Sequence, residues 1–203
     1  MSESIKLAIK ELAPTQLTAG MREVDRKRLR WRRKHDDRAA EYFDLHPFPV
    51  ILGPAARHYL IDRHHLTRAL FEEDIRVVSV SIVADLSALS PDEFWAALEM
   101  RSWTHPYDER GVRRTYDELP RSIEGLVDDP YRSLAGALKR AGGYAKDKAP
   151  FSEFRWADYL RCHIPHEWVE RDFDRALGLA MSLADSTNAA SLPGWRRHSE
   201  PMR

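Results

Sequence analysis

Polar and apolar residues alternate most regularly between residues 75 and 84, where β-branched side chains predominate. This pattern predicts a strand. Shorter apolar runs at residues 4–12, 48–52 and 59–61 predict three more strands, and the last two form a hairpin-like pair around a Gly-Pro turn. All four runs lie in the first half of the chain, so we expect a small mixed sheet there.

Helical spacing of apolar residues follows the turn-rich segment 14–20 and predicts a helix over residues 21–34. A second, short helix is predicted over residues 65–71. Ser90 and Glu93 have the spacing of a capping box, which predicts a helix that begins there. The second half has little strand propensity, and we expect helices at residues 120–126, 131–141, 153–162 and 165–187.

These elements predict an α+β protein in two parts. Residues 1–85 would form the mixed sheet with its helices, and residues 86–203 would form a helical extension packed on it, or continue it as one domain. A chain of 203 residues is long enough for one domain with a well-buried core, or for one such domain with a substantial extension.

The composition is typical of a water-soluble globular protein and does not indicate a particular reaction. Hydrophobic residues make up 43% of the chain and charged residues 32%, and the formal net charge is zero, so no overall charge attracts nucleic acid or an anionic membrane. One cysteine, Cys162, excludes an internal disulfide and a cysteine-based zinc site. No apolar run is long enough to cross a bilayer, and we expect a cytoplasmic protein without a membrane partner.

The densest cluster of reactive side chains is Asp62-Arg63-His64-His65, between the predicted strand at 59–61 and the helix that follows it. The start of a helix exposes backbone N–H groups and suits a phosphate. Asp62 is placed to act as a base or to hold a metal ion, and an imidazole is able to hydrogen-bond or move protons. Alternatively, Asp62 caps the helix and both histidines fill partly buried positions.

Glu23 lies in the first turn of the helix at 21–34, where a carboxylate stabilises the helix dipole. It would become a second carboxylate of a phosphate pocket if the turn at residues 14–16 met the Asp62 turn. The same helix is strongly basic, which indicates either a solvated face or a surface for nucleic acid. Its cationic residues are Arg22, Arg26, Lys27, Arg28, Arg30, Arg32, Arg33 and Lys34.

Trp103-Thr104-His105-Pro106-Tyr107-Asp108 forms a second dense polar and aromatic segment. Its rings would stack on a base or close over a small substrate, and Asp108 would pair with an ammonium group; alternatively the rings anchor a loop to the core. Arg132 follows Asp129 and Pro130 in the first turn of a predicted helix, where a cation needs an anion or a buried carboxylate as partner.

Several of these segments resemble the ParB/sulfiredoxin superfamily. They are Pro14-Thr15-Gln16, Glu23, Phe48-Pro49-Val50-Ile51 and Tyr59 to His65. The chain is most similar to the branch labelled "ParB-like nuclease", whose relatives include free-serine kinases. The likeness to the superfamily covers residues 5–85, and the likeness to the branch also takes in residues 103–111 and 128–146.

The kinase relatives carry an Asp-Gly-His-His-Arg motif, which falls on Asp62 to Leu66, with Arg63 in place of glycine and Leu66 in place of arginine. The resemblance implies a nucleotide-dependent phosphotransferase that uses ATP or ADP with Mg²⁺ and a small hydroxyl-bearing substrate such as serine. It implies catalytic roles for Glu23, Asp62 and His65, with Asp62 also at the metal. Phosphate contacts would come from Thr15, Gln16, Arg63, His64 and Arg68, and substrate contacts from Trp103, Thr104, His105, Tyr107, Asp108 and Arg132.

Two alternatives remain open. In one, the fold serves as a nucleic-acid-binding module through the basic helix. In the other, the same pocket hydrolyses a nucleotide or phosphodiester, with water in place of the acceptor. The chain lacks the cysteine that sulfiredoxin requires at this motif, and we find no helix-turn-helix DNA reader.

Overall fold

The computed structural model describes residues 4–34 and 39–196, and the chain divides into two compact units, residues 1–128 and 129–203. The first unit contains every strand of a five-stranded sheet, and the second is helical, which confirms the α+β class. The boundary predicted between residues 85 and 86 falls inside the first unit. Residues 104–128 belong to that unit because they return to the N-terminal segment; the amide of His105, for example, donates to the carbonyl of Thr15 at 2.9 Å.

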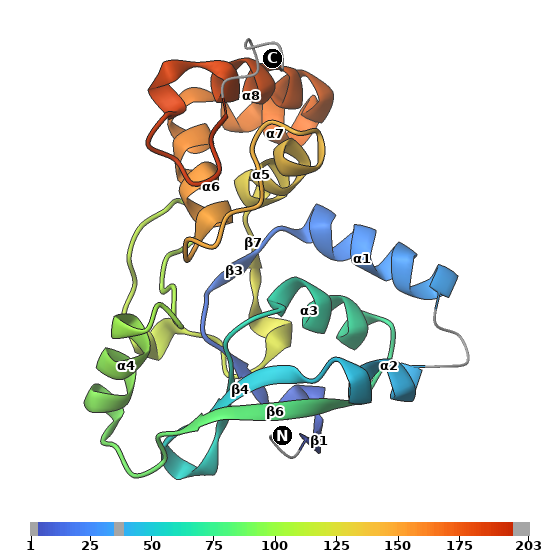
Figure 1. Ribbon diagram of the computed structural model, residues 1–203, viewed down its shortest axis with the longest axis vertical. Helices are drawn as coiled ribbons and strands as arrows, with labels where there is room; N and C mark the ends of the chain where they lie inside the picture. The colour runs from blue at the N-terminus through green and yellow to red at the C-terminus, as the bar shows by residue number, and fades with distance from the viewer. Residues whose placement is uncertain (1–3, 35–38, 197–203) are drawn as a thin grey trace, which may run out of the picture. The chain divides into compact units, whose positions relative to one another are not determined.

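The sheet has the order β1-β6-β4-β5-β2, and Figure 1 shows β4 beside β6. β1 is antiparallel to β6, β6 is parallel to β4, β4 is antiparallel to β5, and β5 is parallel to β2. The predicted strands at 48–52, 59–61 and 75–84 are therefore confirmed within one or two residues. The strands are β1 (Ser4–Ala8), β2 (Leu12–Pro14), β4 (Phe48–Leu52), β5 (His58–Leu60) and β6 (Val77–Asp85), and a 3-10 turn at Pro54–Ala56 joins β4 to β5.

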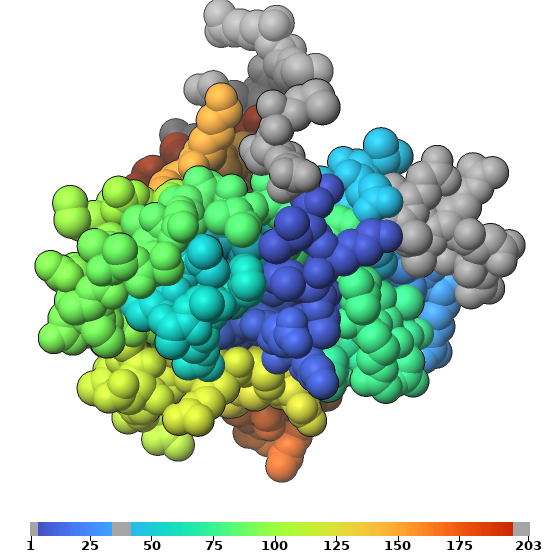
Figure 2. Space-filling model, turned by 90° about the horizontal axis from the view of Figure 1, so that it is seen from below, coloured from blue at the N-terminus to red at the C-terminus, as the bar shows by residue number. Residues whose placement is uncertain are grey.

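The single strand predicted over residues 4–12 is wrong. β1 and β2 lie at opposite edges of the sheet, and a 3-10 turn at Ile9–Glu11 carries the chain from one edge to the other. Ile9 is buried at this turn, and its amide donates to the carbonyl of Arg76. Figure 2 shows β1, in dark blue, at the surface of the first unit, in agreement with its exposed residues.

Different helices pack on the two faces of the sheet. Successive side chains on a strand point to opposite faces and so enter different cores. Val50 and Leu60 lie in the core that contains Val24 of α1 and Leu70 of α3. Their neighbours on the same strands, Ile51 and Tyr59, lie in a second core with Phe94 and Leu98 of α4. The helices are α1 (Met21–Lys34), α2 (Ala39–Leu45), α3 (His64–Glu72) and α4 (Pro91–Met100), and α1 and α3 lie side by side (Figure 1).

A second, two-stranded sheet joins β3 (Thr18–Ala19) to β7 (Val127–Asp128) in parallel. The helix predicted over residues 120–126 is wrong, because this second sheet requires the residues that follow it, 127 and 128, to be extended. Only 3-10 turns at Tyr116–Glu118 and Ile123–Gly125 form in this region, because residue 127 must be extended for its amide to donate to the carbonyl of Leu17 at 3.0 Å.

The second unit has its own core, formed by residues such as Leu134, Trp156 and Leu160. The helix predicted over 165–187 is two helices, because Asp172 leaves the helical conformation (φ −141°) and its carboxylate accepts the amide of Arg175 as the cap of the next helix. The helices are α5 (Pro130–Arg140), α6 (Ser152–His163), α7 (His166–Arg171) and α8 (Phe173–Asp185), followed by a 3-10 turn at Thr187–Ala189. Among the described helices, none has the length and apolar character that a membrane crossing demands.

Candidate functional site

Thr15 connects three segments that are far apart in the sequence. Its amide donates to Nε2 of His64 at 3.3 Å, and its hydroxyl donates to the carbonyl of Leu60 at 2.9 Å. Its own carbonyl accepts the hydroxyl of Thr104 and the amide of His105, both at 2.9 Å. We call this group of five residues the Thr15 junction. It brings together residues that the sequence predicts for phosphate binding and residues that it predicts for substrate binding.

The junction forms where two parallel strands end. β2 and β5 run in register, with Pro14 opposite Leu60, so the residues that follow both strands emerge at the same edge. The turn at residues 14–16 and the Asp62 turn therefore meet, which was the condition for a shared pocket. Burial is nearly complete here, since Thr15 is 1% exposed and Thr104 is 4% exposed.

His65 makes a second connection, from the start of α3 to the start of α1. Its Nε2 accepts the amide of Gly20 at 3.0 Å, and the next amide, of Met21, donates to a carboxylate oxygen of Asp128 at 2.7 Å. A neutral imidazole that accepts at Nε2 carries its proton on Nδ1. Asp128 could not be predicted as the partner of Met21, because these two residues are 107 positions apart.

Asp62 is exposed, and its carboxylate accepts the amide of Arg63 at 2.6 Å. It does not cap α3 in the usual way, because the N-cap position belongs to Arg63. Arg63 has φ 64° and ψ 23°, the left-handed conformation that favours glycine. Its guanidinium donates to the carbonyl of His46 at 2.7 Å and lies 5.5 Å from the ring centre of Phe48.

Three other predicted residues are engaged with protein groups. Glu23 is 8% exposed, and both its carboxylate oxygens bind Arg26, at 2.5 and 3.1 Å. Arg68 pairs with Glu72 at 2.7 Å and also donates to main-chain carbonyls. The side-chain Nε2 of Gln16 donates to the carbonyl of residue 18 at 2.7 Å. These contacts leave Asp62 as the exposed carboxylate among the predicted catalytic groups.

Asp108 is the last residue of the predicted substrate-binding segment, residues 103–108, and both of its carboxylate oxygens contact protein groups. One oxygen accepts the amides of Arg110 and Val112 at 2.9 and 2.8 Å, and the other pairs with Arg114 at 2.6 Å. Burial acts to raise the pKa of Asp108, but the hydrogen bonds from Val112 and Arg114 outweigh it, so the pKa lies below its usual value. Arg114 thus takes the position that the sequence assigned to a substrate ammonium.

The aromatic rings of this segment contact protein groups. Tyr107 lies against His105, with ring centres 4.5 Å apart, and Trp103 lies 5.5 Å from the guanidinium of Arg101. Trp103 also packs on the core beneath α4. Both rings fit the alternative in which they anchor the loop.

Arg132 belongs to the second unit and is 4% exposed. Its guanidinium lies 3.7 Å from the ring centre of Phe154. Burial lowers its pKa to about 10 against the attraction of Glu153 and Asp129. Asp129 is also buried, which raises its pKa, and pairs with Arg161 at 2.6 Å. The surroundings of Arg132 fit its second alternative, a buried carboxylate as partner.

The charge of α1 is compensated in part by acidic residues of α1 and α3. Arg28 and Arg32 bind Glu73 at 2.8 and 2.5 Å, and Arg28 also pairs with Glu72 at 3.0 Å. Those pairs join α1 to α3, so this part of the basic helix has a structural role. They weaken the case for α1 as a nucleic-acid surface.

Comparison with known proteins gives a family and a solved relative. The model of a family described as "Putative ParB-like nuclease" matches residues 5–162. The crystal structure of protein Atu1540 from Agrobacterium tumefaciens is similar at 46% sequence identity and a TM-score of 0.89, over 96% of this chain and 98% of that chain. No curated protein matches the chain.

Proposed function

The chain belongs to the ParB-like nuclease family, and on that premise we propose that it hydrolyses a phosphodiester bond beside the Thr15 junction. The observation that carries the proposal is the convergence of three segments on Thr15, which fixes the exposed Asp62 beside the first turn of α3. The first turn of a helix presents backbone N–H groups to an anion.

In the proposed reaction, the phosphate binds at the first turn of α3 and Asp62 accepts a proton from the attacking water. The new P–O bond forms to the water oxygen, the P–O bond to the leaving group breaks, and the leaving oxygen takes a proton from solvent. His64 and His65 act as positioning residues, because each holds the backbone amide of another segment. Glu23 is less suited to the base role, since Arg26 occupies both of its oxygens.

Mg²⁺ fits this proposal only as an ion shared with the substrate. Residues 4–34 and 39–196 contain no group of three or more His, Cys, Asp or Glu side chains arranged to hold a metal ion. Mg²⁺ commonly binds through one or two carboxylates together with substrate phosphates. Asp62 would be its protein ligand, and the ion would neutralise charge on the phosphate.

A hydrolysis assay tests the proposal. We expect the protein to cleave bis(4-nitrophenyl) phosphate or a short single-stranded oligonucleotide in the presence of Mg²⁺. Asp62→Asn should lower kcat by roughly 100-fold, the usual contribution of a general base. Asp74→Asn is the matched control, because it changes an exposed carboxylate after the other end of α3. No cleavage of any diester, or equal rates for both variants, would refute the proposal.

Transfer of phosphate to a small hydroxyl compound is the second candidate. One observation favours it: Arg63 has a left-handed backbone at the position where the kinase motif has glycine. Glycine adopts this conformation without a steric cost, so the backbone at residue 63 suits the glycine of that motif. Phosphoserine formed from ATP or ADP, Mg²⁺ and serine, and lost in Asp62→Asn and Glu23→Gln, would assign the site to this reaction.

A further inference from the structure

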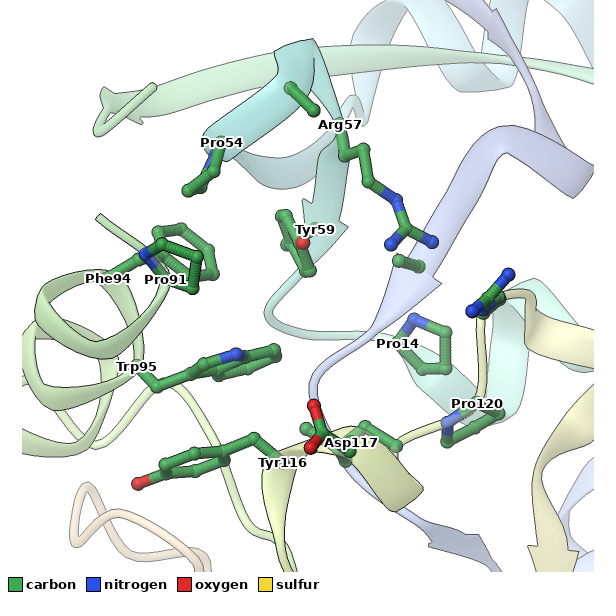
Figure 3. A pocket seen from close by; sticks show the side chains of 14 residues that line it. Pro14, Pro54, Arg57, Tyr59, Pro91, Phe94, Trp95, Tyr116, Asp117 and Pro120 are labelled. Carbon is green, nitrogen blue, oxygen red and sulfur yellow. The ribbon is translucent and has the colours of Figure 1, made fainter. Parts of the chain in front are cut away.

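A pocket of about 290 Å³ lies on the face of the first unit that α4 covers (Figure 3). Its walls come from β2, β5, the β4–β5 connection, α4 and the segment at 116–121. Small-molecule sites are typically concave and largely apolar, with a few polar groups that fix orientation. This pocket combines an apolar part, formed by aromatic rings and prolines, with charged side chains at its rim, and none of the catalytic, phosphate-binding or substrate-binding residues predicted from the sequence lines it.

The apolar part of the pocket is a set of tightly packed rings. Trp95 stacks on Tyr116 with ring centres 4.8 Å apart and an angle of 7°, and it meets Tyr59 edge-on at 5.5 Å. Gly53 allows this packing, since a Cβ there would lie 2.6 Å from the Tyr59 ring and 2.7 Å from Phe94. These rings form the apolar wall of the pocket, against which a planar ligand ring is able to pack.

Three charged side chains line the same pocket. They are Arg57, Asp117 and Arg121, all exposed. Across the described part of the chain, none of the three makes a hydrogen bond or an ion pair with another side chain or the backbone. Most other arginines of this unit do, for example Arg28 and Arg114. Two unpaired guanidinium groups suit an anion, and Figure 3 shows the carboxylate of Asp117 directed into the pocket.

We propose that this pocket binds one nucleotide of the substrate, with the base against Trp95 and a phosphate at Arg57 and Arg121. The two oxygens of Asp117 match the adjacent ring N–H and amino group of guanine, so guanine is the preferred base. Pro14 lines the pocket and is followed in the chain by Thr15, so one segment contributes to both the pocket and the Thr15 junction. That the nucleotide is part of the substrate rests on the proposed function; the binding itself does not.

Calorimetric titration with GMP, AMP, CMP and UMP tests the site. GMP should bind most tightly, and Arg57→Gln and Arg121→Gln should each weaken its binding by roughly tenfold. Asp117→Asn should lower the ratio of the GMP affinity to the UMP affinity by about fivefold or more. All three side chains are exposed, so the variants should fold. Arg33→Gln, an exposed arginine of α1, is the matched control and should leave GMP binding unchanged.

The outcomes separate this inference from the proposed function. Binding of GMP that persists in Asp62→Asn while hydrolysis is lost supports both. GMP binding without any diester hydrolysis supports the pocket and refutes the reaction. Absence of binding by all four nucleotides at millimolar concentration, or binding that Arg57→Gln and Arg121→Gln leave unchanged, refutes the pocket.

Discussion

At the scale of single residues, the function depends on side chains whose partners lie far away in the sequence. The Asp62-to-His65 cluster was recognisable because four polar residues follow a strand. The atoms that these residues contact could not be predicted. His64 binds Thr15, which is 49 positions away, and His65 binds Gly20, which is 45 positions away. Local patterns carry no information on such pairings, which depend on the strand order of the whole sheet.

Arg63 is one of six non-glycine residues with a positive φ in the described part of the chain. A left-handed conformation costs an L-residue about 1–2 kcal/mol, and the cost is larger for β-branched side chains. Arg63→Gly removes this cost but also the hydrogen bond to the carbonyl of His46, so we expect the free energy of unfolding to change by less than about 1 kcal/mol. Arg63→Val should destabilise the protein by about 2 kcal/mol or more.

Urea denaturation of both variants measures the difference. Arg57→Val serves as the control, because Arg57 is exposed, has an ordinary φ of −81° and precedes β5. Equal loss of stability in Arg63→Val and Arg57→Val would show that the backbone at residue 63 is not strained.

At the scale of elements, the sequence predicted best where the signal was local. The capping box of α4 is confirmed, with the Ser90 hydroxyl accepting the amide of Glu93 and the Glu93 carboxylate accepting the amide of Ser90. The errors fall where long-range pairing decides the conformation. β3 and β7 are two residues each and join positions 109 apart, and no periodicity is visible in so short a segment.

The contact between α1 and α3 should depend on pH. The hydrogen bond from Arg32 lowers the pKa of Glu73 below its usual value of 4.5, with Arg28 adding to the effect. A carboxylate with a lowered pKa stabilises the fold above its unfolded pKa, and this contribution is lost as the pH falls through the folded pKa. Glu73→Gln should therefore destabilise the protein at pH 7, and the difference from wild type should shrink as the pH falls below 4.5.

The measurement is the free energy of unfolding of both proteins from pH 7 to pH 3. The wild-type advantage at pH 7 should also decrease at high salt, since Arg32 is largely exposed. A difference that is constant across this range would contradict an ionic role for Glu73.

At the scale of the whole molecule, the chain contains two units with separate cores. The sequence indicated the change from mixed to helical structure but located it near residue 85. The later boundary depends on residues 104–128, whose contacts with Thr15 and β3 belong to the first unit. The pocket beside α4 could not be predicted for a similar reason, because the stacked rings of Trp95 and Tyr116 come from different segments of the chain.

The two cores should respond independently to substitution. Leu160→Ala removes a fully buried side chain from the second unit and should cost about 2–5 kcal/mol there. Hydrogen exchange measured by mass spectrometry should show faster exchange in peptides from 129–196 and little change in peptides from 4–128. Leu70→Ala, in the core of the first unit, should give the reverse pattern. Equal acceleration in both units would show that they unfold as one.

The most direct test of the central claim is a crystal structure of the Asp62→Asn variant with an uncleaved dinucleotide. The proposed function predicts that the scissile phosphate lies within hydrogen-bonding distance of the backbone amides of the first turn of α3, beside residue 62. A dinucleotide whose phosphate lies away from this turn, with the Thr15 junction intact, would contradict it.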